Sequence, residues 1–305
     1  MALHEKEWFI QAPWGRLCII AWGDCYDPPV LVCHGTKDAA VSFRPLINLL
    51  PRNFYYIGLE LPGNGKSDPM PAGLMVSVYD LLYSLQIVVK HFRWDSFIFL
   101  GHSFGCTLGV YYDLCFPGKI SKTIHLDPIS LGIAVPEQNF PDWYQLSFLE
   151  YFENYAKYTN NQDRPKYGRE EAVSKVMERR GFSEEQARAL VERVTEPVEG
   201  GLIRFTFDER LQKTTHAPLS PEYVKKLFTS IKTPTLSIIA TESKKSKKYL
   251  FSEYLFDEKA YEGSYRVREV EGRHDVHVSH AESVAMYVRP FLLQGFQGLD
   301  NKAKL

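Results

Sequence analysis

Short, wholly apolar runs that recur along the first third of the chain constrain the fold most. Val30–Cys33, Phe54–Leu59 and Phe97–Leu100 each lack the polar alternation of a half-exposed strand, which is typical of strands buried on both faces. Between the second and third runs, Val76–Phe92 repeats apolar residues at helical spacing. Strands separated by helices predict right-handed crossovers, and therefore a mostly parallel sheet covered by helices on both faces.

The rest of the chain adds strands on either side of a long stretch that shows no strand pair. Between Ile129 and about Ser230, the apolar spacing predicts helices only. A final helix is predicted from Ala281 to Leu293. The further predicted strands are Gly15–Trp22, Ser121–Leu126, Thr235–Ala240 and Tyr265–Glu271.

The long stretch between the strands predicts a helical insertion. Its helices are expected over Asp142–Tyr158, Glu170–Arg180 and Ser183–Thr195, and the last opens with a capping box in which Ser183 precedes Gln186 by three residues. The first carries an aromatic stripe, which is more often core packing than a ligand site. The stripe consists of Tyr144, Phe148, Tyr151 and Tyr155.

These elements predict an α/β fold with a mostly parallel, doubly wound sheet and a helical cap inserted after the sixth strand. The core is expected from residues 1–130 and 231–295, the cap from 131–230, and a flexible tail from 296–305. With 305 residues, of which 45% are hydrophobic and 24% charged, the chain has enough apolar material for such a core.

Charge and composition exclude several classes of function. The 36 basic and 37 acidic side chains give a net charge of −1, so no bulk field attracts nucleic acid or an anionic membrane. No apolar run approaches the roughly 20 residues of a membrane span, and the first residues lack the apolar region of a secretion signal. Five cysteines without paired spacing indicate neither a zinc site nor a disulfide framework. We expect an intracellular protein with no metal and no cofactor.

One glycine-flanked serine follows a predicted buried strand directly. Gly101-His102-Ser103-Phe104-Gly105 lies between the strand Phe97–Leu100 and the possible helix Cys106–Cys115. In this strand–turn–helix setting, G-x-S-x-G is typical of a tight turn that lifts the serine hydroxyl out of the sheet edge, and the glycines provide room that side chains would fill. Ser103 is therefore the candidate nucleophile.

A serine hydroxyl needs a base, and the base needs an acid that fixes its tautomer. His274 follows the strand Tyr265–Glu271 and is the best candidate base, whereas His277 and His280 nearby are more often surface or structural histidines. Two acids follow strands: Asp127 and Glu242. We favour Asp127, since Glu242 opens a lysine-rich loop that solvent can surround, but the sequence leaves both open.

The dipeptide His34-Gly35 closes the strand Val30–Cys33. At this position the backbone amide of Thr36, together with that of Phe104, is suited to donate hydrogen bonds to a developing oxyanion. No substrate-binding residues can be named from the sequence.

Taken together, these residues resemble the α/β-hydrolase fold family over residues 12–293. The motifs that carry the resemblance are His34-Gly35, the loop Leu61–Asp68, Gly101-x-Ser103-x-Gly105 and Gly272-x-His274. More narrowly, Ala12-Pro13-Trp14-Gly15, Phe54-Tyr55-Tyr56 and His274-x-x-His277 are similar to the serine hydrolase-like proteins of animals, which are related to the insect Kraken protein. Departures are small: Glu60 stands where Asp is usual, and Lys37 and Asp38 follow the oxyanion residue in place of apolar groups.

The resemblance implies Ser103 as nucleophile, His274 as base and Thr36 and Phe104 as oxyanion donors. We expect a serine hydrolase that cleaves small carboxylic esters, with an apolar acyl or aromatic group, through an acyl-enzyme. One alternative is an acyl-CoA thioesterase, for which Lys37 and the loop Lys244–Lys248 would offer charges for phosphates. The other is a ligand-binding protein that keeps the scaffold but turns over little.

The chain ends in Ala303-Lys304-Leu305, close to the S-K-L signal that the peroxisomal import receptor reads. We therefore expect a peroxisomal location, with the cytoplasm as the alternative.

Overall fold

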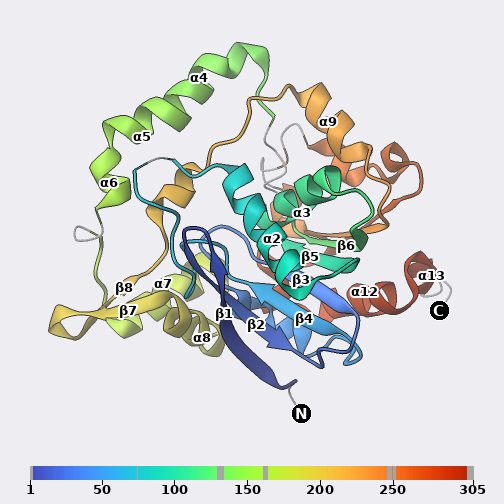
Figure 1. Cartoon of the computed structure of the whole chain (residues 1–305), viewed down its shortest axis with the longest axis horizontal. Helices are drawn as coiled ribbons and strands as arrows, with labels where there is room; N and C mark the ends of the chain where they lie inside the picture. The colour runs from blue at the N-terminus through green and yellow to red at the C-terminus, as the bar shows by residue number, and fades with distance from the viewer. Residues whose placement is uncertain are drawn as a thin grey trace.

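An eight-stranded sheet runs through the centre of the molecule (Figure 1). The computed structural model describes residues 3–73, 75–128, 134–160, 164–245, 249 and 252–300. The strand order is β1-β2-β4-β3-β5-β6-β9-β10, in which the first two neighbouring pairs are antiparallel and the other pairs parallel. The strands are β1 (Glu5–Ala12), β2 (Gly15–Trp22), β3 (Pro29–Cys33), β4 (Tyr55–Leu59), β5 (Phe97–His102), β6 (Ile120–Leu126), β9 (Thr235–Ala240) and β10 (Tyr265–Val270).

The predicted α/β class and mostly parallel sheet are confirmed. Strand β1 was not predicted, because its side chains are largely exposed and carry no buried run. It forms an antiparallel hairpin with β2 and lies at one edge of the sheet.

Helices and short turns cover both faces of the sheet, and the apolar side chains form two core clusters. Alternate residues of a strand enter opposite clusters: Val30 and Val32 join one, Leu31 and Cys33 the other. This alternation is the two-residue period of a strand buried on both sides. The core helices and turns are η1 (Ala40–Phe43), α1 (Arg44–Ile47), α2 (Val78–Phe92), α3 (Phe104–Cys115), α10 (Thr241–Lys245), η8 (Glu253–Phe256), η9 (Glu258–Tyr261), α11 (Val276–Ser279), α12 (Ala281–Gln294) and α13 (Phe296–Asp300).

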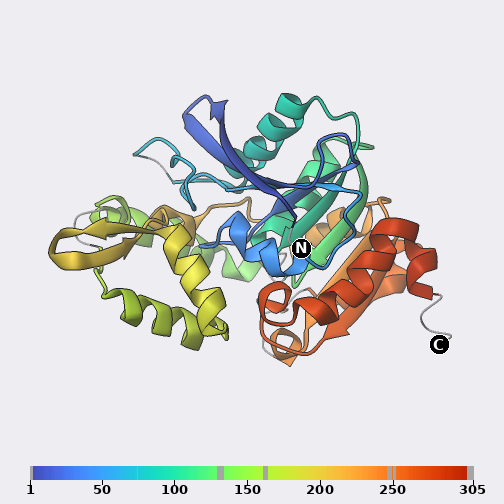
Figure 2. The ribbon, with the colours of Figure 1, turned by 90° about the horizontal axis from the view of Figure 1, so that it is seen from below.

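Residues 134–230, between β6 and β9, are called the insertion below. Its helices α7 and α8 lie beside the hairpin β7–β8 to one side of the sheet, and α4–α6 form an arm at the edge of the molecule (Figures 1 and 2). The elements are η3 (Glu137–Asn139), α4 (Phe140–Tyr144), the π-helical turn η4 (Gln145–Leu149), α5 (Glu150–Glu153), α6 (Tyr155–Thr159), α7 (Arg169–Arg180), α8 (Glu184–Val194), β7 (Thr195–Val198), η5 (Glu199–Gly201), β8 (Leu202–Phe205), η6 (Glu209–Lys213) and α9 (Pro221–Thr229).

The structure corrects the expected helix content of the insertion. The antiparallel pair β7–β8 contradicts the prediction that this stretch contains no strand pair. Gly200 and Gly201 both have positive φ values of 78° and 72°, which allows the tight connection between two strands of only four residues. The capping box at Ser183 and Gln186 is confirmed at the start of α8.

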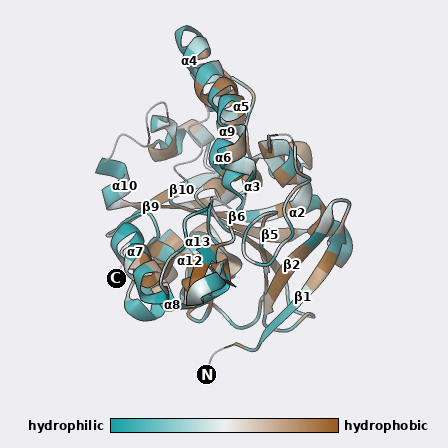
Figure 3. Ribbon diagram, turned by 90° about the vertical axis from the view of Figure 1, so that its left-hand side faces the viewer, coloured by the Kyte–Doolittle hydropathy of each residue, from teal (hydrophilic) through white to brown (hydrophobic). Residues whose placement is uncertain are grey.

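The helix predicted over Asp142–Tyr158 is broken into pieces by the π-helical turn η4 and by Asn154. Its aromatic stripe does not share one environment. Tyr151 is fully buried and stacks on Tyr158, whereas Tyr144 and Tyr155 are exposed. Apolar and polar segments alternate along this arm (Figure 3).

The flexible tail predicted from residue 296 begins too early. Residues 296–300 form α13, where Leu299 is buried and the ring of Phe296 packs against Phe291 at 5.5 Å between centroids. Gly298 permits this turn to pack on the carbonyl of Pro290, a place that a side chain would fill. The terminal residues Ala303, Lys304 and Leu305 lie outside the described residues. Among the described helices, none has the length and apolar character needed to cross a membrane.

Candidate active site

The candidate nucleophile lies in a strained turn at the carboxyl end of β5. Ser103 has φ 51° and ψ −120°, and α3 begins at the next residue, Phe104. A positive φ at a non-glycine residue is unfavourable and persists only where the surroundings enforce it. A Cβ on Gly105 would overlap the carbonyl oxygen of Cys33, so only glycine lets α3 start this close to β3. The turn therefore holds Ser103 at the sheet edge in one backbone conformation.

The candidate base and acid are in direct contact. Nδ1 of His274 lies 2.6 Å from Oδ2 of Asp127. The other carboxylate oxygen, Oδ1, accepts hydrogen bonds from the amide of Ala240 at 2.9 Å and from the hydroxyl of Tyr249 at 2.7 Å. Asp127 itself is fully buried. Because a carboxylate only accepts, His274 carries a proton on Nδ1, and its Nε2 is left as the acceptor.

Backbone contacts bring the nucleophile to this pair. The amide of Ser103 donates to the carbonyl of Leu126 at 3.0 Å, one residue before Asp127. On the other side, the ring of His102 lies 4.6 Å from the ring of His274. Ser103, Asp127 and His274 thus come from the ends of β5, β6 and β10, which meet at the carboxyl edge of the parallel strands.

The alternative acid lies elsewhere. Glu242, in α10, has a side chain that is 57% exposed and pairs with Arg273, Nε to Oε2 3.5 Å. The two neighbouring histidines also differ from His274. His277 is fully buried, and His280 is exposed beside Ser279. Of the two candidate acids, Asp127 is the one that contacts the base.

The segment after β3 lies against the serine turn. A Cβ on Gly35 would come within 2.9 Å of Cβ of Ser103, so the backbone passes directly beside the candidate nucleophile. Nε2 of His34 accepts a hydrogen bond from the amide of Leu61 at 3.0 Å, which ties the segment to the end of β4. Thr36, next along the chain, is exposed, and Phe104 begins the helix α3. The two candidate oxyanion amides thus belong to the residue after Gly35 and to the residue after Ser103.

A sequence profile described as the alpha/beta hydrolase fold matches residues 28–281. The chain belongs to this family. Among curated relatives, human serine hydrolase-like protein 2 is 27% identical over 93% of this chain and 92% of its own. The mouse serine hydrolase-like protein is 27% identical over 99% of both chains. These relatives support a hydrolase.

Solved structures agree on the fold of this α/β hydrolase. A hypothetical protein from Pseudomonas aeruginosa superposes with a TM-score of 0.78 at 22% identity, covering 94% of this chain and 98% of its own. A thioesterase domain from the curacin biosynthetic pathway superposes with a TM-score of 0.74 at 20% identity, covering 92% and 98%. At such identities the likeness extends to the architecture alone.

Beside the candidate site of this α/β hydrolase lies a cluster of buried histidines and acids that sequence reasoning did not bring together. Burial lowers the pKa of His102 well below its usual value and that of His277 to about 4, so both rings are neutral at pH 7. Nε2 of His102 lies 3.2 Å from the carbonyl oxygen of His274. Since a carbonyl only accepts, Nε2 of His102 carries the proton and donates to the loop that carries His274.

The acids of this cluster are Asp38 and Asp275, and both bind Arg180. One ligand atom each from Asp38, His102, Asp275 and His277 lies within 4.8 Å of the others. A metal would compete there with a guanidinium that already binds both carboxylates. Asp38 was noted in the sequence only as a departure from an apolar residue. Its partner Arg180 gave no signal beyond its place at the end of a predicted helix.

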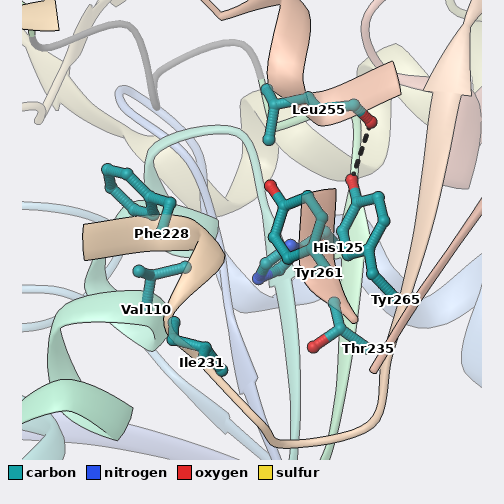
Figure 4. A pocket seen from close by; sticks show the side chains of 8 residues that line it. All are labelled: Val110, His125, Phe228, Ile231, Thr235, Leu255, Tyr261 and Tyr265. Atoms are coloured by element: carbon teal, nitrogen blue, oxygen red, sulfur yellow. Dashed lines mark hydrogen bonds between the residues drawn. The ribbon is translucent and has the colours of Figure 1, made fainter. Parts of the chain in front are cut away.

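A small cavity of about 20 Å³ lies near β6 and contains none of the candidate catalytic residues (Figure 4). His125 points into it, and neither of its ring nitrogens has a hydrogen-bond partner in the described part of the chain. Burial lowers the pKa of His125 to about 3. The cavity is large enough for one water molecule rather than a substrate. Its other lining residues are Val110, Phe228, Ile231, Thr235, Leu255, Tyr261 and Tyr265.

Proposed function

We propose that this α/β hydrolase is a serine hydrolase that cleaves carboxylic esters. The observation that carries the proposal is the contact between His274 and buried Asp127, 2.6 Å, beside a serine held at φ 51°. A nucleophile, an oriented base and flanking backbone amides are the parts that acyl transfer to serine requires.

In the proposed reaction, Nε2 of His274 takes the proton from Oγ of Ser103 as this oxygen bonds to the ester carbonyl carbon. The amides of Thr36 and Phe104 donate to the resulting oxyanion. His274 then gives its proton to the departing alkoxide, which leaves as an alcohol. Water, deprotonated by His274, attacks the acyl-enzyme, and the acid is released as Ser103 regains its proton. Asp127 stabilises the charged imidazole throughout.

The arm offers partial support for an apolar acyl or aromatic substrate. Phe140, Tyr144, Leu146, Leu149 and Phe152 are exposed along α4, η4 and α5. The hydroxyl of Tyr155 donates to the carbonyl of Gly73 at 3.1 Å, which links the arm to the chain before α2.

Ester cleavage is favoured over acyl-CoA thioester cleavage because two of the lysines named for phosphates, Lys37 and Lys244, already pair with glutamates. Nζ of Lys37 lies 3.1 Å from Glu209, and Lys244 pairs with Glu269; Lys247 and Lys248 lie outside the described residues. Rates on a simple ester and on an acyl-CoA of equal chain length separate these functions. A faster thioester reaction would favour the alternative.

Labelling by a fluorophosphonate probe tests the activated serine. We expect wild-type protein to label and Ser103→Ala not to label. Ser121→Ala is the matched control, because Ser121 is an exposed serine at the opposite end of β6 from Asp127; it should label like wild type. A wild-type protein that stays unlabelled would contradict the proposal and favour a binding protein on the hydrolase scaffold.

We also propose that the terminal Ala303-Lys304-Leu305 directs the protein to peroxisomes, on the basis of the sequence alone. A fluorescent protein fused before residue 1 should colocalise with a peroxisomal marker in cells. The same fusion lacking the last three residues should remain in the cytosol. An unchanged distribution would contradict the import signal.

A further inference from the structure

The last residue of α7 sends its side chain out of the insertion and into the core. Arg180 donates through Nε to Asp275 Oδ2 at 3.1 Å and through Nη2 to Oδ1 of the same carboxylate. Its Nη1 donates to Asp38 Oδ1 at 3.1 Å. The Asp38 side chain is 1% exposed and the Asp275 side chain 7%. One planar guanidinium therefore bridges two carboxylates that solvent barely reaches.

The two carboxylates belong to the two loops that the proposed reaction uses. Asp275 directly follows His274, the proposed base. Asp38 follows Thr36, the proposed oxyanion donor, by two residues. We call the loop after β10, which carries His274 and Asp275, the base loop, and the loop after β3, which carries Thr36 and Asp38, the oxyanion loop. Arg180 connects these two loops through side chains, although β3 and β10 are not neighbours in the sheet.

The two buried carboxylates need the positive charge of Arg180. Burial alone would raise the pKa of both aspartates, but Arg180 holds each pKa below its ordinary value. The neutral rings of His102 and His277 supply no cation at pH 7. Without the guanidinium, two buried carboxylates would face each other unpaired, and the loops that carry them would be driven apart or would take up a proton.

The base loop is held from a second side by the serine turn. His102 donates to the carbonyl of His274, and its ring packs against the tilted ring of His277 at 4.1 Å between centroids. Nε2 of His277 in turn lies 3.4 Å from Oγ of Ser42, which donates to Asp38 at 2.9 Å. The base loop, the oxyanion loop and the serine turn are therefore joined in one buried network, and Arg180 is its cation.

We propose that Arg180 is a positioning residue: docking of α7 holds His274 and the amide of Thr36 in their catalytic arrangement around Ser103. This inference rests on the proposed serine hydrolase function. If Arg180 has this role, the insertion sets the turnover rate through one guanidinium that touches none of the reacting atoms. This effect is separate from any contact between the insertion and the substrate.

The test measures kcat and KM for a p-nitrophenyl ester in the full chain. Arg180→Ala should lower kcat by about 100-fold, the typical effect of a displacement of about 1 Å in a catalytic group, with KM changed less than about threefold. Guanidinium chloride at tens of millimolar should restore kcat at least about tenfold, because the ion fits the space and charge of the lost group. Sodium chloride and urea at the same concentrations should not. Arg179→Ala, which removes an exposed neighbour on α7, should behave like wild type.

Arg180→Lys provides a second variant if the alanine variant does not fold. Lysine keeps the charge but cannot bridge two carboxylates with a planar fork, so kcat should fall with KM nearly unchanged. Wild-type kcat in Arg180→Lys, or a deficit in Arg180→Ala that guanidinium does not relieve, would overturn the inference. Fluorophosphonate labelling of wild type at Ser103 distinguishes failure of the serine hydrolase function from failure of the positioning role. If wild type labels and the kcat of Arg180→Lys equals that of wild type, the positioning role alone is refuted.

Discussion

Replacing Asp127 by asparagine changes one atom at the centre of the candidate site. Oδ1 of Asp127 is fixed by two donors, the amide of Ala240 and the hydroxyl of Tyr249. The asparagine carbonyl oxygen must therefore take this place, since the amide nitrogen cannot accept from either donor. The NH2 group then faces Nδ1 of His274, where the carboxylate now accepts. Two donors cannot share that position, so His274 must change tautomer.

The change of tautomer at His274 determines how far kcat falls. With its proton on Nε2, His274 cannot take the proton from Ser103. In a serine protease triad the same change lowers kcat by about 10⁴-fold, which corresponds to about 5.5 kcal/mol of transition-state stabilisation. The three contacts of Asp127 place it in the same geometric relation to its histidine, so we expect a loss of this order. Because Asn is nearly isosteric with Asp, the midpoint of thermal unfolding should change by only a few degrees.

The assay compares the initial rate of fluorophosphonate labelling and the kcat for a p-nitrophenyl ester. Glu242→Gln is the matched control, since it removes the charge of the alternative acid, which pairs with Arg273 at the surface; its rates should lie within about twofold of wild type. An Asp127→Asn variant within tenfold of wild type would refute the tautomer argument. Loss of activity in Glu242→Gln instead would assign the acid to Glu242.

Three further changes test packing and buried charge. Arg193→Met leaves the fully buried Glu60 carboxylate without its guanidinium partner, so the free energy of unfolding in urea should fall by about 3–5 kcal/mol; a loss below 1 kcal/mol would contradict this. Gly105→Ala places a Cβ against the carbonyl of Cys33 and should abolish probe labelling, whereas wild-type labelling would show that the turn can relax. Burial lowers the pKa of His125 to about 3, below the unfolded value of about 6.5, so the unfolded chain binds a proton that the native state does not. Native stability therefore falls with pH from about 6.5 towards 3, and His125→Gln should reduce that slope by one proton, on the order of 1 kcal/mol per pH unit; an unchanged slope in urea titrations would contradict it.

Elements fixed by local sequence could be predicted, and those fixed by packing could not. Thr235–Ala240 was predicted with the bounds that β9 has, because every side chain in it is apolar or small and all are buried. Strand β1 escaped prediction because it is an edge strand, held mainly by pairing with β2. The hairpin β7–β8 was missed although Gly200-Gly201 marks a turn, since its flanking runs are short, only partly buried and contain Pro197.

The same distinction applies to the site. Ser103, Asp127 and His274 could each be named because each follows a strand, and the carboxyl ends of parallel strands share one edge. The sequence could not choose between Asp127 and Glu242, because the choice depends on which side chain is buried against His274. Arg180 could not be found at all. It lies 142 residues from Asp38 and 95 from Asp275, and only the packing of α7 brings the three together.

The two helices α7 and α8 each send an arginine into the core. Because the two arginines have different partners, we expect one to affect mainly the free energy of unfolding and the other mainly kcat. Arg193 contacts Glu60, Glu7 and Cys18, none of which belongs to the serine turn or the base loop. Arg180 contacts Asp275 and Asp38, in the two loops that the proposed reaction uses. Arg193→Met should therefore lower the free energy of unfolding while kcat in the folded fraction stays within a few fold, and Arg180→Lys should lower kcat with a smaller effect on unfolding. Equal effects of both variants on kcat would mean that docking of the insertion as a whole, rather than the guanidinium of Arg180, sets the geometry of the loops.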